Sequence, residues 1–290
     1  METQLRSDVA MLAETIGPRS LVNPDALKTT ADYIVQRLES SGWTVRRLPY
    51  MVGLASCENI EVEKRGSTLP EKIVVIGAHY DTVTQTPGAD DNASGVAALL
   101  ALAESFASAT PSRTLRFVAF VNEEPPYFQT DQMGSRVYAR RCKANGDKVV
   151  AMLALESMGL FRDEKKSQHY PFPLSLFYPS RGNFLAIVGN TDSKALVRRV
   201  KATIERSGTI PVESASLPGS LQGVGWSDHW SFWQEGYPAV MVTDTAPFRN
   251  QHYHKRTDTA ATLDYVRLGA AVQALSNAAE DLLSSPRAGK

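Results

Sequence analysis

The stretch GAHYDTVTQTPGADDNASG, Gly77–Gly95, decides how the rest of the sequence is interpreted. It follows the apolar run Ile73–Ile76 and leads into a second apolar run, Val96–Leu102. Between the two runs lie one histidine and three aspartates, in a segment rich in turn-forming residues. Side chains that commonly bind metals therefore stand between two segments that have the character of a buried core.

The composition excludes several classes of protein. The chain has 290 residues, 43% of them hydrophobic, so it contains enough apolar material for a sizeable core. Its 31 basic and 31 acidic residues balance, which argues against a main role in binding nucleic acid or anionic membranes. Two cysteines, Cys57 and Cys142, are too few for a disulfide framework and fit a reducing compartment. No signal-peptide pattern or membrane-length apolar run is visible, so we expect a cytoplasmic protein.

Strand and helix patterns alternate along the whole chain, which is typical of an α/β fold. The run Lys72–Ala78 is continuously apolar, as in a strand covered on both faces. A stretch rich in Pro, Tyr and Phe interrupts the alternation, and we expect an inserted loop near residues 160–184. The prediction is a single domain, residues 1–290, with a mixed, largely parallel twisted β-sheet sandwiched between α-helices. Further strands are expected at residues 44–48, 59–63, 114–122, 148–156, 184–189 and 238–243, and helices at residues 5–16, 24–38, 94–107, 135–145, 193–206 and 264–283.

Acidic and imidazole side chains follow four of the expected strands at their carboxyl ends, where open α/β sheets bind ligands. Parallel strands place their carboxyl ends at the same edge of the sheet, so these side chains should converge in space although they are far apart in sequence. Two imidazoles with several carboxylates form the ligand set of a hydrolytic zinc site, possibly with two metals. The residues are His79 and Asp81, Glu123 and Glu124, Glu156, and His252 and His254.

Each piece taken alone has a simpler explanation. Asp90-Asp91-Asn92 could be a turn and a helix cap, and Glu123-Glu124 the start of an exposed loop. Glu156 is harder to dismiss, because an apolar strand rarely carries an unpaired carboxylate inward. Chemistry alone does not separate Asp90 from Asp91, or His252 from His254. The joint placement at equivalent strand ends favours a metal site.

Six motifs then occur in the order found in one family: GAHYDT, PGADDNASG, FVNEE followed by MGS, LES, SDHWSFWQEGYPA and YHKRTDT. In this combination the chain resembles bacterial zinc aminopeptidases of peptidase family M28, from about Gly17 to the last helix. The resemblance implies a peptidase that uses zinc-activated water to release amino-terminal residues. The implied partner is a peptide with a free amino terminus, with no nucleic acid and no membrane.

The resemblance also implies roles for individual residues. Glu123 matches the general base, and Asp81 matches the carboxylate that accepts the second imidazole N–H of His79. Asp90 matches the carboxylate that bridges two zinc ions, and the Asp90–Asp91 peptide bond is expected to be cis. Two zinc ions per chain are expected, held by His79, Asp90, Glu124, Glu156 and His254.

A long loop departs from the commonest family pattern. Nine residues, Pro125–Met133, separate Glu124 from Gly134-Ser135, and Tyr127 and Phe128 within them could shape the substrate pocket. Trp230 and Tyr253 are the other two candidates for that pocket. Trp226, Phe232 and Trp233 could line it as well, although ordinary core positions suit several of these aromatic residues.

Three other functions are weighed against the aminopeptidase. A serine hydrolase built on Ser227-Asp228-His229 is disfavoured, because triad members normally come from separate segments. A glutaminyl cyclase, an acyltransferase of a related family that uses one zinc, is the main alternative, since its members also have a longer segment after Glu-Glu. A non-catalytic binding module that has lost its metals is less favoured, because no ligand position is missing here.

Overall fold

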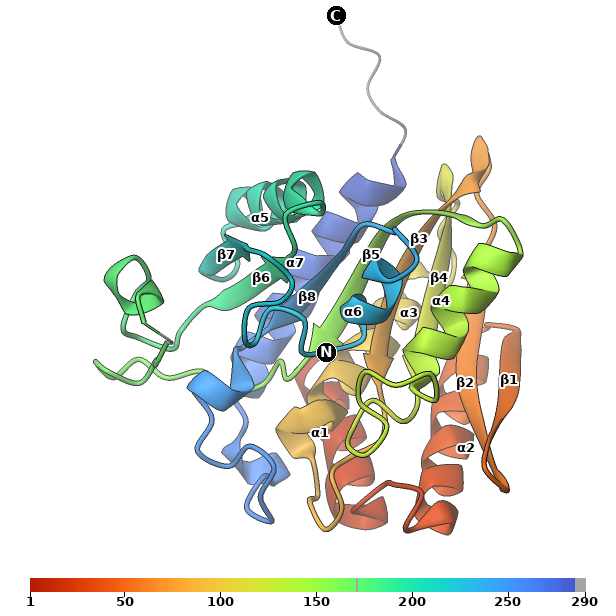
Figure 1. Cartoon of the computed structure of the whole chain (residues 1–290), viewed down its shortest axis with the longest axis horizontal. Coiled ribbons are helices and arrows are strands. Elements are labelled where there is room, and N and C mark those ends of the chain that lie inside the picture. The colour runs from red at the N-terminus through yellow and green to blue at the C-terminus, as the bar shows by residue number, and fades with distance from the viewer. Residues whose placement is uncertain (171, 285–290) are drawn as a thin grey trace, which may run out of the picture.

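The computed structural model describes residues 1–170 and 172–284, and one twisted eight-stranded sheet runs through it (Figure 1). The strand order is β1-β2-β4-β3-β5-β8-β6-β7. The four central strands β4, β3, β5 and β8 are mutually parallel, whereas β1, β2 and β4 pair antiparallel and β6 runs antiparallel to β8. The strands are β1 (Val45–Val52), β2 (Ala55–Lys64), β3 (Leu69–His79), β4 (Arg113–Phe120), β5 (Lys148–Glu156), β6 (Leu185–Gly189), β7 (Val212–Ser216) and β8 (Ala239–Thr243).

Helices cover both faces of this sheet. One face packs against α1, α2, α3, α5 and α7, and the other against α4 and the short α6. The expected α/β class, a mixed sheet sandwiched between helices, is therefore confirmed. The helices are α1 (Glu2–Ala10), α2 (Pro24–Ser40), α3 (Gly95–Phe106), α4 (Gly134–Ala144), α5 (Lys194–Ser207), α6 (His229–Trp233) and α7 (Tyr265–Leu283), and a π-helical turn (Met11–Ile16) extends α1.

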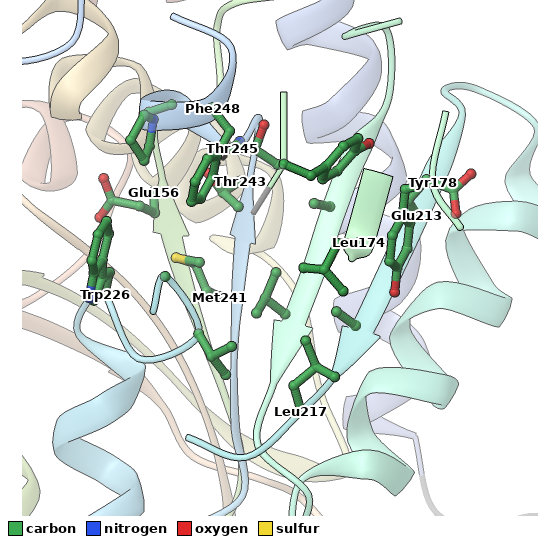
Figure 2. Close-up of a pocket in the computed structure, with 18 of the residues that line it drawn as sticks. Glu156, Leu174, Tyr178, Glu213, Leu217, Trp226, Met241, Thr243, Thr245 and Phe248 are labelled. Atoms are coloured by element: carbon green, nitrogen blue, oxygen red, sulfur yellow. Dashed lines mark hydrogen bonds between the residues drawn. The ribbon is translucent and has the colours of Figure 1, made fainter. Parts of the chain in front are cut away.

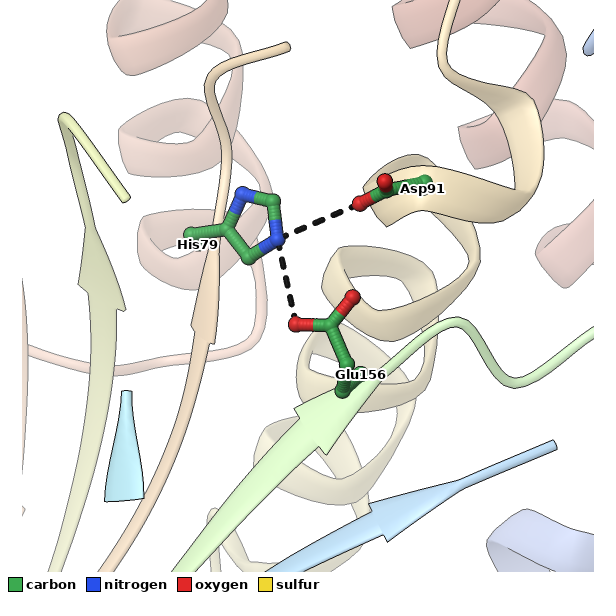
Figure 3. A group of neighbouring side chains, drawn as sticks. All are labelled: His79, Asp91 and Glu156. Carbon is green, nitrogen blue, oxygen red and sulfur yellow. Dashed lines mark ion pairs between the residues drawn. The ribbon is translucent and has the colours of Figure 1, made fainter. Parts of the chain in front are cut away.

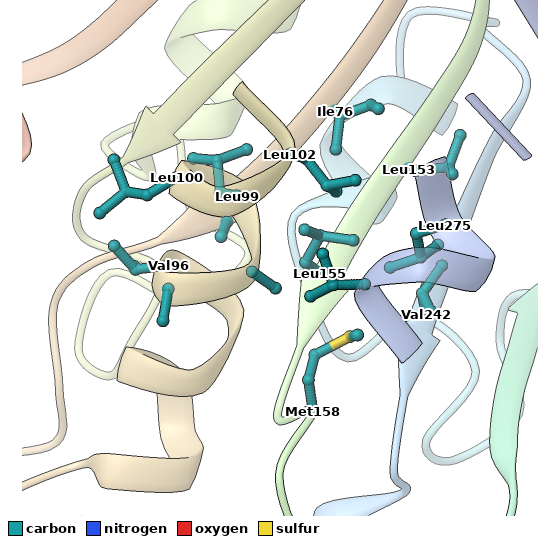
Figure 4. Close-up of a cluster of buried hydrophobic side chains, with 14 of the residues drawn as sticks. Ile76, Val96, Leu99, Leu100, Leu102, Leu153, Leu155, Met158, Val242 and Leu275 are labelled. Carbon is teal, nitrogen blue, oxygen red and sulfur yellow. The ribbon is translucent and has the colours of Figure 1, made fainter. Parts of the chain in front are cut away.

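The larger core layer lies between the sheet and helices α3 and α7 (Figure 4). Leu99 and Leu102 of α3 and Leu275 of α7 meet Leu153 and Val242 from the central strands, and all five side chains are buried. Burying one such side chain stabilises the fold by about 1.5–3 kcal/mol. This layer fixes the carboxyl ends of β3, β5 and β8 relative to the start of α3.

The start of α3 comes very close to the end of β5. A Cβ atom at Gly95 would lie 2.7 Å from the carbonyl oxygen of Leu155 and 2.2 Å from Oδ1 of Asn92. Asn92 in turn donates to the Leu155 carbonyl at 2.8 Å and accepts from the Ser157 amide at 3.0 Å. The segment that precedes α3 is thus bonded directly to the strand end that carries Glu156.

Two elements have no counterpart among the expected ones. β7 is short, lies at the sheet edge and has mostly polar, half-buried residues, so it lacks the apolar pattern that marks the other strands. The helix α6 is five residues long and shows too little periodicity to predict. Between β5 and β6, the described residues 157–170 and 172–184 hold a single 3-10 turn, Leu174–Leu176.

In the described part of the chain, no helix is both long and apolar enough to cross a membrane. Cys57 and Cys142 are both free thiols and both buried.

Candidate metal centre

Two groups of potential metal ligands meet at the carboxyl ends of the central strands. In the first, Nε2 of His79 lies 3.3 Å from Oδ1 of Asp91 and 3.2 Å from Oε2 of Glu156 (Figure 3). His79 is the last residue of β3 and Glu156 the last residue of β5, while Asp91 precedes α3. The convergence expected from the strand ends is therefore present in the structure.

The second group contains the other oxygen of Asp91. Nε2 of His254 lies 3.0 Å from Oδ2 of Asp91 and 3.4 Å from Oε2 of Glu124. Glu124 follows β4, and His254 lies in the turns that follow β8. One carboxylate, that of Asp91, thus belongs to both groups and offers one oxygen to each.

This geometry corrects two expectations about Asp90. The carboxylate between the two groups belongs to Asp91, because Asp90 is turned away toward Asn250, whose Nδ2 donates to it at 2.7 Å, and toward the Gly159 amide at 2.9 Å. The expected cis bond between Asp90 and Asp91 is also wrong, since the cis bond joins Asp91 to Asn92. Asp258 holds this arrangement by accepting the backbone N–H groups of both Asp90 and Asp91, at 3.0 and 3.2 Å.

Asp81 supports the opposite side of the centre in the same way. Its carboxylate accepts the backbone N–H groups of Glu123 and Glu124, each at 3.1 Å. The expected contact to His79 differs in detail: Nδ1 of His79 lies 3.2 Å from the Asp81 carbonyl oxygen and 3.6 Å from its carboxylate. The carbonyl is the acceptor within hydrogen-bond distance, so it favours the tautomer that leaves Nε2 free to bind a metal.

The expected catalytic base, Glu123, lies at the edge of the first group. Its Oε2 is 3.9 Å from Nε2 of His79, and its side chain is buried. Ser227 donates to Oε2 of Glu156 at 2.7 Å, while Nε2 of His229 bonds the Val224 carbonyl at 2.8 Å. Ser227 and His229 therefore do not form a nucleophile–base pair, in agreement with the sequence argument against a serine hydrolase.

The residues of this centre have the properties that metal binding requires. Four buried atoms of the two ligand groups lack any hydrogen-bond partner, namely Nε2 of His79, Nε2 of His254, Oδ1 of Asp91 and Oε1 of Glu124; Asp228, His229 and Asp244 have other unpaired atoms of this kind. Buried polar atoms are normally paired, and a nitrogen and oxygen donor set suits a divalent cation such as zinc. His252, the alternative to His254, instead bonds Thr257 and joins neither group.

Burial and mutual charge shift the pKa values of these groups. Burial raises the pKa of Glu124 to about 7, and it raises the pKa values of Glu123 and Glu156 as well. For His254, burial opposes protonation, but the nearby carboxylates of Asp91 and Glu124 raise the pKa to about 10. Burial would also raise the pKa of Asp91, but the two imidazoles beside it hold it below the usual range. Without a metal, the centre therefore retains protons at neutral pH.

An apolar pocket with about 870 Å³ of empty space, its open mouth included, begins at Glu156 (Figure 2). Its floor is a row of paired strand residues, Glu156 on β5, Thr243 on β8, Ala186 on β6 and Glu213 on β7. Three strand spacings make this row ~14 Å long. Among its described lining residues, Glu156 and Glu213 are the charged ones. Its walls are formed by large apolar and aromatic side chains, which include Tyr170, Leu174, Tyr178, Phe184, Trp226 and Phe248.

One of the four expected pocket residues lines this pocket. Tyr253 does so, and its ring stacks on the His254 imidazole with centroids 3.8 Å apart. Tyr127, Phe128 and Trp230 are not among its lining residues, and Tyr127 packs against the large core instead. The loop that carries Tyr127 is bonded to the segment before α6, because Nε2 of Gln129 donates to the Gly225 carbonyl at 2.9 Å.

Sequence reasoning missed several residues that support the centre. Asp258 was recognisable only from its spacing after His254, and Ser227 from its place in SDHWSF. Asp228 is buried against the centre with neither carboxylate oxygen in a close hydrogen bond, and burial raises its pKa to about 7. Their roles depend on contacts between distant segments, which periodicity does not reveal.

Comparisons with known proteins identify the family of this chain. The model of peptidase family M28 matches residues 59–279. The uncharacterized protein YfbL of Escherichia coli (strain K12) is 40% identical over 278 residues, 93% of this chain and 84% of that protein. A probable leucine aminopeptidase of Trichophyton verrucosum is 29% identical over 254 residues, 79% of this chain, and the aligned part spans only 62% of that protein.

Solved structures share the fold at low identity. The zinc aminopeptidase BSAP from Bacillus subtilis superimposes with a TM-score of 0.79 at 16% identity, covering 100% of this chain and 96% of that one. The glutaminyl cyclase of Porphyromonas gingivalis reaches 0.72 at 20% identity, covering 97% and 98%. Such likeness establishes the architecture and does not distinguish between the two activities.

Asp91 and Asp90 provide a direct test of the ligand assignment. We expect Asp91→Asn to weaken zinc binding about 10-fold or more, because the amide has lost the negative charge and can offer an oxygen to only one of the two groups. Asp90→Asn is the matched control one residue away and should bind zinc like the parent protein. Zinc content after dialysis, with binding measured by chelator competition, checks both. A zinc loss confined to Asp90→Asn would restore the assignment based on the family motif.

The raised pKa values predict how the stability of the metal-free protein depends on pH. Glu124, Asp228 and His254 bind protons more tightly in the folded chain than in the unfolded one, so unfolding releases protons. The free energy of unfolding should therefore fall as the pH rises from about 5 to about 9. Zinc, which replaces these protons, should flatten the decline. Thermal unfolding of chelator-treated and zinc-loaded protein across this range tests it, and a metal-free midpoint that rises with pH would contradict it.

Proposed function

The chain belongs to peptidase family M28, and we propose that it is a zinc aminopeptidase that removes the first residue of peptides with a free amino terminus. Family membership supports a metal-dependent peptidase in general terms. One observation carries the finer proposal, namely the Asp91 carboxylate, which offers one oxygen to each of two ligand groups. A shared carboxylate of this kind is suited to two metal ions.

The two groups would divide the ligands evenly. His79, Asp91 and Glu156 would hold one zinc ion, and Asp91, Glu124 and His254 the other. When bound, zinc supplies a Lewis acid that polarises a carbonyl group and makes water more acidic. Three protein ligands per ion leave room for substrate and water, as in other catalytic zinc sites.

Glu123 has the position and environment of a residue that moves a proton. It lies beside His79 without belonging to either ligand group, and Asp81 fixes its backbone. Burial, and then the neighbouring carboxylates Glu124 and Glu156, raise its pKa well above the usual range of a glutamate. Such a group would take a proton from the attacking water and pass it to the departing amine.

The surroundings of the centre favour cleavage at the end of a peptide. The apolar pocket begins at Glu156 and would hold the side chain of the first residue, with the free amine near the carboxylates. The bond between Gln129 and Gly225 ties together two loops that border the centre. This bond would help to narrow the site on that flank, as an enzyme that acts at the end of a peptide requires. The pocket lining favours a large apolar first residue.

Glutaminyl cyclase remains the second candidate because of the shared fold. A cyclase of that type polarises the side-chain amide of an amino-terminal glutamine with one zinc ion. The shared Asp91 and the buried Glu156 argue for two ions, because an additional buried carboxylate is better balanced by a second cation.

The decisive experiment combines a metal count with two assays on the purified chain. We expect close to two zinc ions per chain at saturation, cleavage of aminoacyl-arylamides with large apolar residues, and loss of activity with a chelator. An acetylated amine should abolish cleavage, and this blocked substrate is the matched control. A single zinc ion, with cyclisation of amino-terminal glutamine and no arylamide cleavage, would move the protein to the cyclase class.

Glu123→Gln separates proton transfer from metal binding. The amide keeps the shape of the side chain but cannot accept the proton, so turnover should fall by ~10²-fold or more. Zinc content should stay at the parent level, because Glu123 belongs to neither ligand group. Glu124→Gln, the adjacent control, should lose zinc instead. Parent-level turnover in Glu123→Gln would remove this residue from the reaction.

A further inference from the structure

Arg19 is a completely buried arginine directly behind the centre. Its side chain has 0% exposure and bonds only to main-chain carbonyl oxygens. Nε donates to Tyr80 at 2.9 Å, and Nη2 donates to Gly88 at 2.9 Å. Nη1 serves three further carbonyls, those of Leu12, Gly17 and Pro87, at 2.8, 2.9 and 2.7 Å. All three nitrogens of the guanidinium group thus donate to the main chain.

Three of these five carbonyls belong to the loop between the first two ligands. Tyr80 directly follows His79, while Pro87 and Gly88 shortly precede Asp91. The backbone of Arg19 adds two bonds to the same loop, from its N–H to Oγ1 of Thr82 at 3.0 Å and from the Thr82 N–H to its carbonyl at 2.8 Å. A single residue therefore holds both ends of the loop from His79 to Asp91.

The charge of Arg19 is also unusual. Among the described residues it forms no ion pair, although a buried cation is normally paired. Burial lowers the pKa of this guanidinium to about 10, and the carboxylates of Asp258, Asp81 and Asp91 act in the opposite direction. Asp258 and Asp81 are the two that bind the backbone of the ligand-bearing segments. The guanidinium charge thus lies where it offsets their negative charge.

A purely local role does not account for these contacts. The carbonyls of Leu12 and Gly17 belong to the π-helical turn and to the residue that follows it, and a neutral donor or water could satisfy them. The bonds to Tyr80, Pro87 and Gly88 reach 61 to 69 residues along the chain. Gly88 is also in close contact, since a Cβ atom there would lie 3.1 Å from Nη2 of Arg19.

We propose that Arg19 is a positioning residue of the metal centre: through its carbonyl bonds it sets the distance between His79 and Asp91, and its buried charge balances the carboxylates behind them. The inference rests on the proposed metal centre. It adds a residue that touches neither metal nor substrate, and its effect is on metal binding before any chemistry.

The test compares Arg19→Lys with Arg37→Lys. Lysine keeps the charge but cannot reach both ends of the loop with one ammonium group. We expect the zinc affinity of Arg19→Lys, measured by competition with a chelator, to fall roughly 10-fold or more. Arg37 is the control because it also bonds a buried partner, Asp8, at 2.9 Å, but lies on α2 outside the centre. Its replacement should lower the melting temperature and leave zinc affinity within about 2-fold.

Thr82→Val provides a milder variant that keeps the test informative if Arg19→Lys does not fold. It removes one bond between the Arg19 backbone and the loop, so zinc affinity should fall about 2- to 5-fold. Cobalt absorption spectra of the same variants report changed ligand geometry independently of activity.

The outcomes separate the two levels of the hypothesis. A folded Arg19→Lys protein that has a lower melting temperature but binds zinc like the parent would overturn the positioning role and leave the metal centre intact. A parent protein that binds no zinc would overturn the centre itself, and with it the role of Arg19. Zinc binding without aminopeptidase activity would contradict the proposed reaction while leaving the Arg19 comparison valid.

Discussion

Four carboxylates, those of Asp91, Glu123, Glu124 and Glu156, share one buried space with two imidazoles, and this crowding of negative charge is the constraint on which the rest of the structure depends. Ionised carboxylates that leave water lose solvation and repel one another at short range. They stay together only if cations and oriented donors surround them. Protons on the two histidines meet part of this need in the metal-free chain, and metal ions would meet it more fully.

Two further buried carboxylates solve the problem of rigidity. Asp81 and Asp258 lie on opposite sides of the centre, and each accepts two consecutive backbone N–H groups from a dipeptide that carries a ligand. Loops at strand ends are usually the mobile part of an α/β fold. Here, a pair of hydrogen bonds to one buried carboxylate holds the backbone of each ligand-bearing dipeptide in place. The negative charges of Asp81 and Asp258 add to the crowding, and the buried positive charge of Arg19 offsets part of it.

Much of this arrangement could be predicted because it depends on topology. Parallel strands place their carboxyl ends at one edge, so ligands far apart in sequence had to converge, and four of the five expected ligand residues do so: His79, Glu124, Glu156 and His254. The choice between Asp90 and Asp91 could not be made in this way. The two neighbours have the same chemistry, and the decision lies in a local backbone bend, with Asp91 at φ −107° and ψ 92°.

The substrate pocket shows a different limit of prediction. Aromatic residues near the motifs were natural candidates, yet the half-buried Tyr127 packs against the core. The floor of the pocket extends over β6 and β7, and the polar sequence of β7 does not predict a strand. A pocket made by pairing across four strands depends on register between segments up to 87 residues apart, from Glu156 to Thr243. Local pattern contains no information about that register.

The fold by itself does not determine which reaction the centre performs, because a zinc aminopeptidase and a glutaminyl cyclase of known structure both share it in outline. The two candidate reactions must instead be distinguished by the number of carboxylates in the site, and hence by the positive charge that the site can bind. Glu156 is the informative group: it is buried, lies 3.2 Å from His79 and is fixed by Ser227 at 2.7 Å. Asp91 faces the same imidazole with one oxygen and His254 with the other. One dication can neutralise two carboxylates, whereas this centre collects four, so a second cation is the simpler way to balance it.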